Sequence, residues 1–310
     1  MQLEIMLFFQ RIQNPFFSFL ANLFSAFGEE SLMIIILLTI YWAVDKKKGF
    51  VIFSSLFLSL GIMQTLKAIV RAPRPFEAHP ELIDADRIET ATGYSFPSGH
   101  STGASSLYSA ILISFRSIWI KTAAFILIIA VPLSRLYLGV HWPIDVTFGL
   151  IIGLGVSVFL SNLFSSIYDD KRKLRRIYVP IGTLLTLVSL LMAILLHLSM
   201  IDETAFSDFM KMLAVFSTAA IGGAVEINSS DFVPPKRMRD KIISTLLGLV
   251  IIIIIQGTKA VMSEKIYYLW SFVRYALTGI AATLLIPRLM IKLGLMKERK
   301  YYTDMFRDVI

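Results

Sequence analysis

Long apolar runs, separated by short basic segments, dominate this sequence. Residues 49–69, 118–133, 148–164 and 242–255 carry few or no charged side chains. Several runs approach the roughly 20 residues that an α-helix needs to cross a bilayer. The strands of a membrane barrel would be much shorter and would alternate polar with apolar residues. Because every backbone group in a bilayer core needs an internal hydrogen bond, the sequence predicts an all-α, polytopic transmembrane helical bundle.

About nine spans are expected, and they divide the chain into three parts. Residues 1–28 are apolar but interrupted around Asn14-Pro15, which favours a broken helix in the membrane interface over a first true span. Residues 29–166 form a membrane core, and residues 167–310 form a C-terminal membrane extension of about four helices. The expected spans are 29–44, 49–70, 97–115, 118–138, 142–164, 177–198, 205–225, 242–259 and 266–290.

The net charge of +8 comes largely from Lys and Arg between the spans. This placement is typical of membrane orientation and argues against nucleic-acid binding. The basic groups of one face are 46–48, 116, 121, 171–176, 236–241 and the C-terminal tail. The positive-inside rule makes that face cytoplasmic in a plasma (inner) membrane, so the opposite face is directed to the periplasm or exterior. The chain has no cysteine, which excludes thiol chemistry and disulfides.

Three polar motifs fall at span ends on this outer face. They are Lys67 with Arg74-Pro75, then Pro97-Ser98-Gly99-His100, and finally Ser134-Arg135 followed by His141 and Asp145. In the third motif, Pro143 favours a helix that begins near Trp142, which brings the Asp145 carboxylate within reach of the His141 ring. A helix N-terminus beside an arginine favours a bound anion such as phosphate. The alternative for this segment is a helix-capping aspartate and a structural histidine.

Together, in this order and spacing, the motifs resemble the three-part signature of the type 2 phosphatidic acid phosphatase superfamily. The resemblance covers about residues 49–166 and identifies the 29–166 core as phosphatase-like. It implies phosphate binding by Lys67, Arg74, Ser98, Gly99 and Arg135. Such cations and helix-start N–H groups suit the oxygens of a phosphoryl group.

The same resemblance implies a phosphohistidine mechanism. His141 would be the nucleophile, Asp145 would fix the tautomer of its ring, and His100 would be the general acid. No set of metal ligands remains, so activity without a metal or other cofactor is expected. The implied partners are a lipid phosphate monoester or diphosphate and the bilayer.

Several alternatives stay open. The signature is similar to that of glucose-6-phosphatase, which suggests a sugar phosphate, and a phosphotransferase would use the same site. Vanadium haloperoxidases share the constellation, but the many spans argue against one. An anion transporter could use Lys211, Glu226 and Arg274. The acidic loop 77–89, with Arg87 as its one basic residue, could gate the site, and the late spans could form a homo-oligomer.

Overall fold

The computed structural model describes residues 1–261 and 264–299, so the end of the basic C-terminal tail lies outside the described residues. A helix forms at every predicted span. Among the described residues, seven helices are long and apolar enough to cross a membrane, or eight if the pair around a 52° bend between residues 15–26 and 30–44 is one span. The prediction of about nine also counted the helix Gly99–Ser114, which has only 16 residues. The protein is an integral membrane protein with a helical-bundle fold.

The chain divides into two compact units. One comprises residues 1–37 and 51–164, and the other comprises residues 38–50 and 165–310. The helices of the first unit, in chain order, are α1 (Gln2–Arg11), α2 (Pro15–Ala26), α3 (Glu30–Thr39), α4 (Lys46–Val70), α5 (Pro75–Ala78), the 3-10 turn η2 (Ile88–Thr90), α6 (Gly99–Ser114), α7 (Ile118–Tyr137) and α8 (Pro143–Asp169). Helices α3, α4 and α8 contain or adjoin the boundaries between the units.

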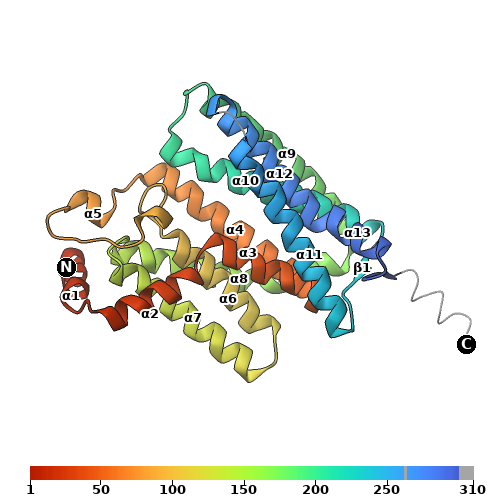
Figure 1. Cartoon of the computed structure of the whole chain (residues 1–310), viewed down its shortest axis with the longest axis horizontal. Helices are drawn as coiled ribbons and strands as arrows, with labels where there is room; N and C mark the ends of the chain where they lie inside the picture. Colours follow the sequence, from red (N-terminus) through yellow and green to blue (C-terminus); the bar gives the residue numbers. More distant parts are fainter. Residues whose placement is uncertain (262–263, 300–310) are drawn as a thin grey trace, which may run out of the picture. The chain divides into compact units, whose positions relative to one another are not determined.

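Within the first unit, α7 runs beside both α6 and α2 (Figure 1). The predicted break in the N-terminal segment lies between α1 and α2, where the Asn14 side chain accepts a hydrogen bond from Phe17 N at 3.0 Å and caps α2. Helix α1 buries Met6 against Leu136 of α7 and Val146 of α8. An interfacial position of residues 1–28 therefore remains a prediction, but α1 is packed on the protein.

Helices α6 and α8 approach closely because glycines line the seam between them. A Cβ on Gly149 would lie 2.9 Å from the Ser98 carbonyl oxygen, and one on Gly153 would lie 2.6 Å from the Thr102 carbonyl oxygen. Side chains at these positions would push the two helices apart. The seam therefore fixes the start of α6 against the first turns of α8.

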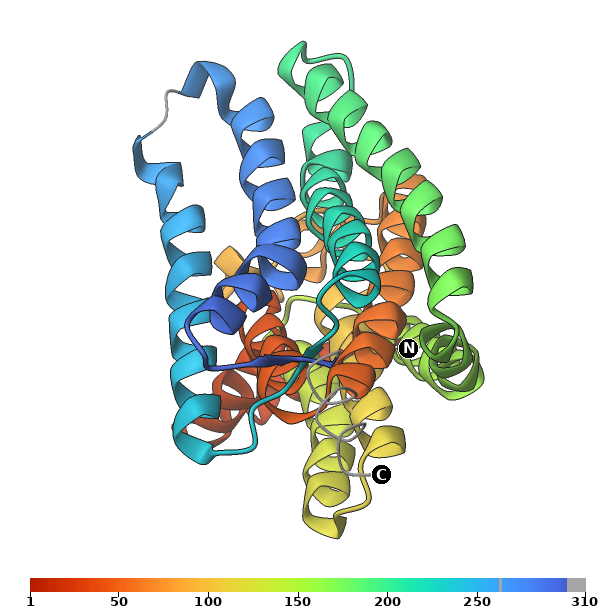
Figure 2. The ribbon, with the colours of Figure 1, turned by 90° about the vertical axis from the view of Figure 1, so that its right-hand side faces the viewer.

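The second unit contains a bundle in which α9, α10 and α12 run side by side (Figure 2). Its elements are the π-helical turn η1 (Ile40–Val44), α9 (Lys171–His197), α10 (Glu203–Asn228), the short strand β1 (Phe232–Val233), α11 (Met238–Gly257), η3 (Thr258–Val261), η4 (Glu264–Ile266), α12 (Tyr267–Ile280), η5 (Ala281–Leu285), α13 (Ile286–Lys292) and the strand β2 (Lys297–Glu298). The two strands pair antiparallel.

The three charged residues that the transporter alternative would use, Lys211, Glu226 and Arg274, each have a partner within this unit. Lys211 pairs with Asp208 at 3.1 Å, and buried Glu226 pairs with Lys46 at 2.5 Å. Arg274 donates to the carbonyl oxygen of Gln256 at 2.9 Å, which caps the end of α11. A cation is favourable at a helix C-terminus, so this arginine has a structural role. These contacts weaken the transporter alternative.

Candidate active site

The turn between α7 and α8 presents His141, and a glycine makes this turn possible. Gly139 has φ +75°, and the N–H groups of Gly139 and Val140 donate to the carbonyl oxygens of Leu136 and Arg135 at 3.1 and 3.3 Å. This pair of bonds is a Schellman motif, which ends a helix through one left-handed residue. A Cβ at Gly139 would also lie 3.1 Å from the Asp84 carbonyl oxygen. The chain therefore turns sharply after Arg135, and this turn places His141 beside the first turn of α8.

The ring of His141 lies between a cation and a carboxylate. Its Nε2 atom is 3.2 Å from Nη1 of Arg74, and its Nδ1 atom is 3.4 Å from Oδ2 of Asp145. Because a guanidinium only donates hydrogen bonds, Nε2 is the acceptor and the ring proton is on Nδ1. The lone pair of Nε2 thus faces Arg74, where an anion would bind. The ring is 2% exposed.

The predicted contact between Asp145 and His141 is present, and Asp145 is also a helix cap. Its Oδ2 atom accepts a hydrogen bond from the N–H group of Trp142 at 2.8 Å, in the manner of a capping box. The two readings of this segment are therefore compatible, because one carboxylate both starts α8 and orients the histidine. Its Oδ1 atom is buried and has no hydrogen-bond partner among the described residues.

Ser95 belongs to the site but was not predicted from the sequence. Its hydroxyl donates to Oδ2 of Asp145 at 2.5 Å and lies 3.4 Å from Nδ1 of His141. The side chain is fully buried. In the sequence, the one feature that could have pointed to Ser95 is its position three residues before Ser98. The residues around it are typical of a loop. The interaction depends on the fold and fixes the carboxylate against the ring.

Backbone carbonyl groups orient two of the predicted phosphate-binding cations, Arg74 and Lys67. Arg74 donates from Nη2 to the oxygen of Thr92 at 2.7 Å, from Nε to that of Gly93 at 3.1 Å and from Nη1 to that of Val140 at 2.9 Å. Lys67 Nζ lies 3.4 Å from the same Thr92 oxygen. Both cations therefore converge on one stretch of the loop before α6.

Arg135, also predicted to bind phosphate, is fully buried. It donates to Ser25 Oγ at 2.5 Å and to Thr90 Oγ1 at 3.3 Å, whereas its Nε has no partner among the described residues. A buried guanidinium without a carboxylate in hydrogen-bond contact retains positive charge for an anion. Among the described residues, no three His, Cys, Asp or Glu side chains are grouped as metal ligands. The donor set is suited to an anion.

The second motif begins helix α6 as predicted. Ser98 is its N-cap, and the Ser98 side chain accepts a hydrogen bond from Ser101 N at 3.4 Å. A Cβ on Gly99 would meet nothing nearer than Met63, at 3.6 Å, so the helix start has room beside it. Nε2 of His100 is buried and has no hydrogen-bond partner among the described residues. The free N–H groups of a helix start and a partnerless imidazole nitrogen are both available to a ligand.

Burial and neighbouring cations keep His141 uncharged. The residue lies in the turn outside the spanning helices, and its pKa falls well below its ordinary value of 6.5. Loss of solvent is the largest cause, followed by the positive charges of Arg74 and Arg135. A neutral imidazole is the form that carries a free lone pair.

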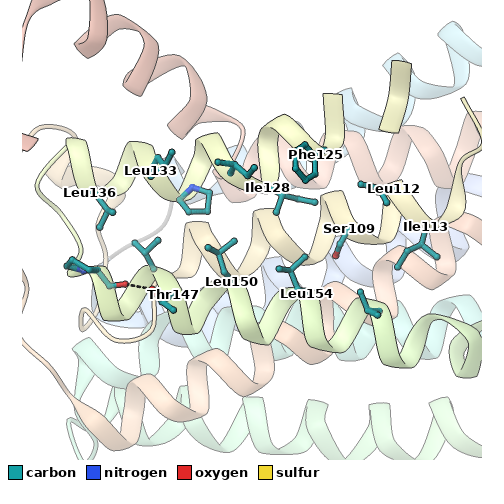
Figure 3. Close-up of a pocket in the computed structure, with 15 residues that line it drawn as sticks. Ser109, Leu112, Ile113, Phe125, Ile128, Leu133, Leu136, Thr147, Leu150 and Leu154 are labelled. Carbon is teal, nitrogen blue, oxygen red and sulfur yellow. Dashed lines mark hydrogen bonds between the residues drawn. The ribbon is translucent and has the colours of Figure 1, made fainter. Parts of the chain in front are cut away.

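An apolar groove of about 530 Å³ lies between α7 and α8, with α6 along it (Figure 3). Its α8 side runs from Pro143 to Val158, about 22 Å at the rise of an α-helix. The two hydroxyls that line it bond to their own helices: Thr147 to Pro143 O at 2.8 Å and Ser109 to Ser105 O at 2.5 Å. The groove therefore presents a hydrocarbon surface that begins next to the third motif.

Comparison with known proteins agrees with the resemblance of the motifs. An undecaprenyl-diphosphatase of Sulfolobus acidocaldarius is 33% identical over 143 residues, which are 44% of this chain and 65% of that protein. A decaprenylphosphoryl-5-phosphoribose phosphatase of Mycobacterium tuberculosis is 32% identical over 107 residues, or 34% of this chain and 56% of that protein. The chain thus spans less than two thirds of the length of either relative.

The crystal structure of Aquifex aeolicus LpxE is a similar solved structure. It aligns with 52% of this chain and 94% of its own, with a TM-score of 0.46 and 22% sequence identity. Two family models also match. The PAP2 superfamily model covers residues 48–169, and the model named PAP2 superfamily phosphatase, transmembrane extension, covers residues 210–299. With both models matched in one chain, this protein belongs to the PAP2 superfamily.

Proposed function

We propose that this protein is a membrane phosphatase that hydrolyses a lipid phosphate monoester or diphosphate through a phosphohistidine at His141. The observation that carries the proposal is the orientation of the buried His141 ring. Its Nε2 lone pair faces Arg74, and its Nδ1 proton faces Asp145. A nucleophile held in this tautomer, beside a guanidinium that would bind the phosphate, is suited to in-line attack on phosphorus.

Hydrolysis would proceed in two steps. Nε2 of His141 attacks the terminal phosphorus, and the bond from phosphorus to the leaving oxygen breaks while His100 supplies that oxygen with a proton. Water then attacks the phosphohistidine while His100 takes a proton from it. The bond from phosphorus to Nε2 of His141 breaks, and inorganic phosphate leaves. Lys67, Arg74 and Arg135, with the Ser98 hydroxyl and the N–H group of Gly99, stabilise the charge on the phosphoryl oxygens.

A lipid substrate is favoured by the apolar groove, whose lining has no free polar group. The groove begins beside the turn that holds His141, so a hydrocarbon chain can extend along α8 while the phosphate occupies the polar site. The relatives named above are, by their names, phosphatases of undecaprenyl diphosphate and of decaprenylphosphoryl-5-phosphoribose, and both of these compounds carry a polyprenyl chain. The distribution of Lys and Arg supports an active site on the outer, periplasmic or extracellular, face.

A substrate panel tests this function. We expect phosphate release from long-chain lipid mono- or diphosphates to exceed release from glucose 6-phosphate by at least about tenfold in kcat/KM, because chain binding contributes. The purified protein would be assayed with phosphatidic acid, phosphatidylglycerol phosphate, undecaprenyl diphosphate, sphingoid-base phosphate and glucose 6-phosphate, with and without a chelator. Preference for the sugar phosphate, a strict metal requirement or transfer to an alcohol acceptor in place of water would each contradict part of the proposal.

The rate should depend on pH through His141. Because its pKa is lowered by burial and by adjacent cations, the ring stays neutral above pH 6.5 and gains a proton only below it. Activity should therefore be retained down to pH 6.5 and be lost, by about tenfold per pH unit, as pH falls through the lowered pKa. The measurement is kcat/KM against pH, corrected for the titration of the substrate phosphate followed by ³¹P NMR. An acid limb centred above pH 6.5 would contradict this assignment.

A further inference from the structure

One arginine outside the predicted motifs lies against the site. Arg87 belongs to the acidic loop between α5 and α6, and its side chain is 20% exposed. Its Nη1 donates to the carbonyl oxygen of Asn22 at 2.9 Å, and its Nη2 donates to the carboxylate of Glu29. Both partners flank the bend between α2 and α3. These two contacts use two of the five N–H donors of the guanidinium.

Two short chains of contacts link Arg87 to the proposed catalytic residues. Thr90 Oγ1 donates to the carbonyl oxygen of Arg87 at 2.9 Å and accepts from Arg135 Nη2 at 3.3 Å. On the other side, Gly28, which precedes Glu29, packs on His100: a Cβ at Gly28 would lie 3.1 Å from Cδ2 of that ring. The guanidinium of Arg87 is therefore held on the side of the site where His100 lies.

The backbone of Arg87 is in an unfavourable conformation. Its φ of +60° and ψ of +40° lie in the left-handed region, which residues other than Gly and Asn rarely adopt. A hydrogen bond from Arg87 N to Asp86 Oδ1 at 2.8 Å and another from Asn22 Nδ2 to Asp86 Oδ2 at 3.1 Å hold this conformation. Strain of this kind is concentrated where a side chain must be aimed at a ligand.

From this placement we propose that Arg87 binds the second phosphate of a lipid diphosphate, the one that remains on the lipid. The inference rests on the proposed function and specifies its substrate class. In an in-line displacement the leaving group lies opposite the nucleophile. His141 would attack the terminal phosphorus, and the bond between that phosphorus and the bridging oxygen would break. The bridging oxygen leaves with the lipid monophosphate and takes a proton from His100, so the retained phosphate lies on the His100 side.

Charge explains why Arg87 distinguishes diphosphates from monophosphates. When a monophosphate ester is hydrolysed, the leaving group is an alcohol, which has no negative charge for this guanidinium to bind. The phosphate that leaves from a diphosphate carries negative charge, which increases as the bridging bond breaks. Arg87 then stabilises the transition state for the diphosphate alone. The carboxylate of Glu29 pairs with this guanidinium and competes with the substrate for it.

Paired substitutions separate this role from a structural one. We expect Arg87→Gln to lower kcat/KM for a polyprenyl diphosphate by about 10- to 100-fold, with less than about threefold change for the monophosphate of the same chain. Arg87→Lys should lose less, because it keeps a point charge. Glu29→Gln should raise the ratio of diphosphate to monophosphate activity, since it removes the competing carboxylate. If the ion pair only supports the fold, both Gln variants should act in the same direction on both substrates.

The controls make each outcome decisive. Arg71→Gln, at the exposed end of α4, is the matched loss of an arginine near the site and should leave the ratio unchanged. Inhibition by inorganic pyrophosphate should weaken in Arg87→Gln, whereas inhibition by inorganic phosphate should not.

Thermal unfolding in detergent identifies a variant that fails to fold, in which case Arg87→Lys and Glu29→Gln provide the test. An unchanged ratio in Arg87→Gln, or a parallel shift in the two Gln variants, would overturn the inference. A wild-type protein that hydrolyses neither lipid would instead overturn the proposed function.

Discussion

Replacing His141 with glutamine should reduce phosphate release by at least about 10⁴-fold, because the variant lacks the nucleophile on which both steps depend. Glutamine keeps a polar group of similar length near Arg74 and Asp145 but cannot form the covalent intermediate. The measurement is inorganic phosphate released from a lipid phosphate by purified variant and wild type in the same detergent. Acid quenching of the wild type with ³²P-labelled substrate should also trap an acid-labile phosphoprotein, which the variant should not form.

A binding measurement and a control variant check whether this loss comes from the chemical step. His141→Gln should still bind inorganic phosphate, because its cations and helix N-termini remain in place. The lipid-facing substitution Phe159→Leu, at an 81% exposed position of α8, is the control for handling in detergent and should keep full activity. Wild-type rates in His141→Gln would mean that another group attacks phosphorus, and the proposed mechanism would be wrong.

The second large effect is expected at Arg74, where lysine should reduce kcat/KM by about 100-fold. Three of its N–H groups bond to the carbonyl oxygens of Thr92, Gly93 and Val140. This arrangement fixes the plane of the guanidinium and leaves Nη1 directed at the atom that attacks phosphorus. A lysine supplies one point charge and cannot reproduce these bonds, so both the position and the number of donors change.

Comparison with Arg71→Lys gives the matched control, because Arg71 lies three residues earlier in the chain. Its Nε donates to the carbonyl oxygen of Ala68, in the last turn of α4, at 3.0 Å. The same chemical change there should alter activity by less than about twofold. Equal activity of Arg74→Lys and the wild type would show that the planar guanidinium of Arg74 is not needed to bind phosphate.

The sequence predicted the helices well because hydrophobicity alone specifies where a chain can cross a bilayer. The start of α8 at Pro143 and the cap of α6 at Ser98 were also predictable, since both depend on neighbours within one turn. The 16-residue length of α6 shows the limit of this reasoning. Its apolar run continues to Phe115, but the backbone of Phe115 is extended and the helix ends at Ser114.

The contacts within the site were less predictable because they join residues that are far apart in the chain. Ser95 touches Asp145 across 50 positions, and Arg87 reaches Glu29 across 58. No local pattern distinguishes either residue from an ordinary loop residue. The motif residues themselves could be found because their order and spacing resemble a known family. Their chemical roles stay predictions until the variants above are measured.

The bond from Ser98 N to the Asp145 carbonyl oxygen, at 3.1 Å, has a consequence for how the enzyme can be handled. It ties together, through main-chain atoms, the two helix starts that hold the reacting groups, close to the glycine seam of α6 and α8. The distances that matter for catalysis are therefore set inside the polypeptide and do not depend on lateral pressure from surrounding lipids. Solubilisation in micelles should preserve turnover of a short-chain substrate. The preference among substrates with long chains depends on contacts at the exposed flank of the bundle, so it should change with the detergent.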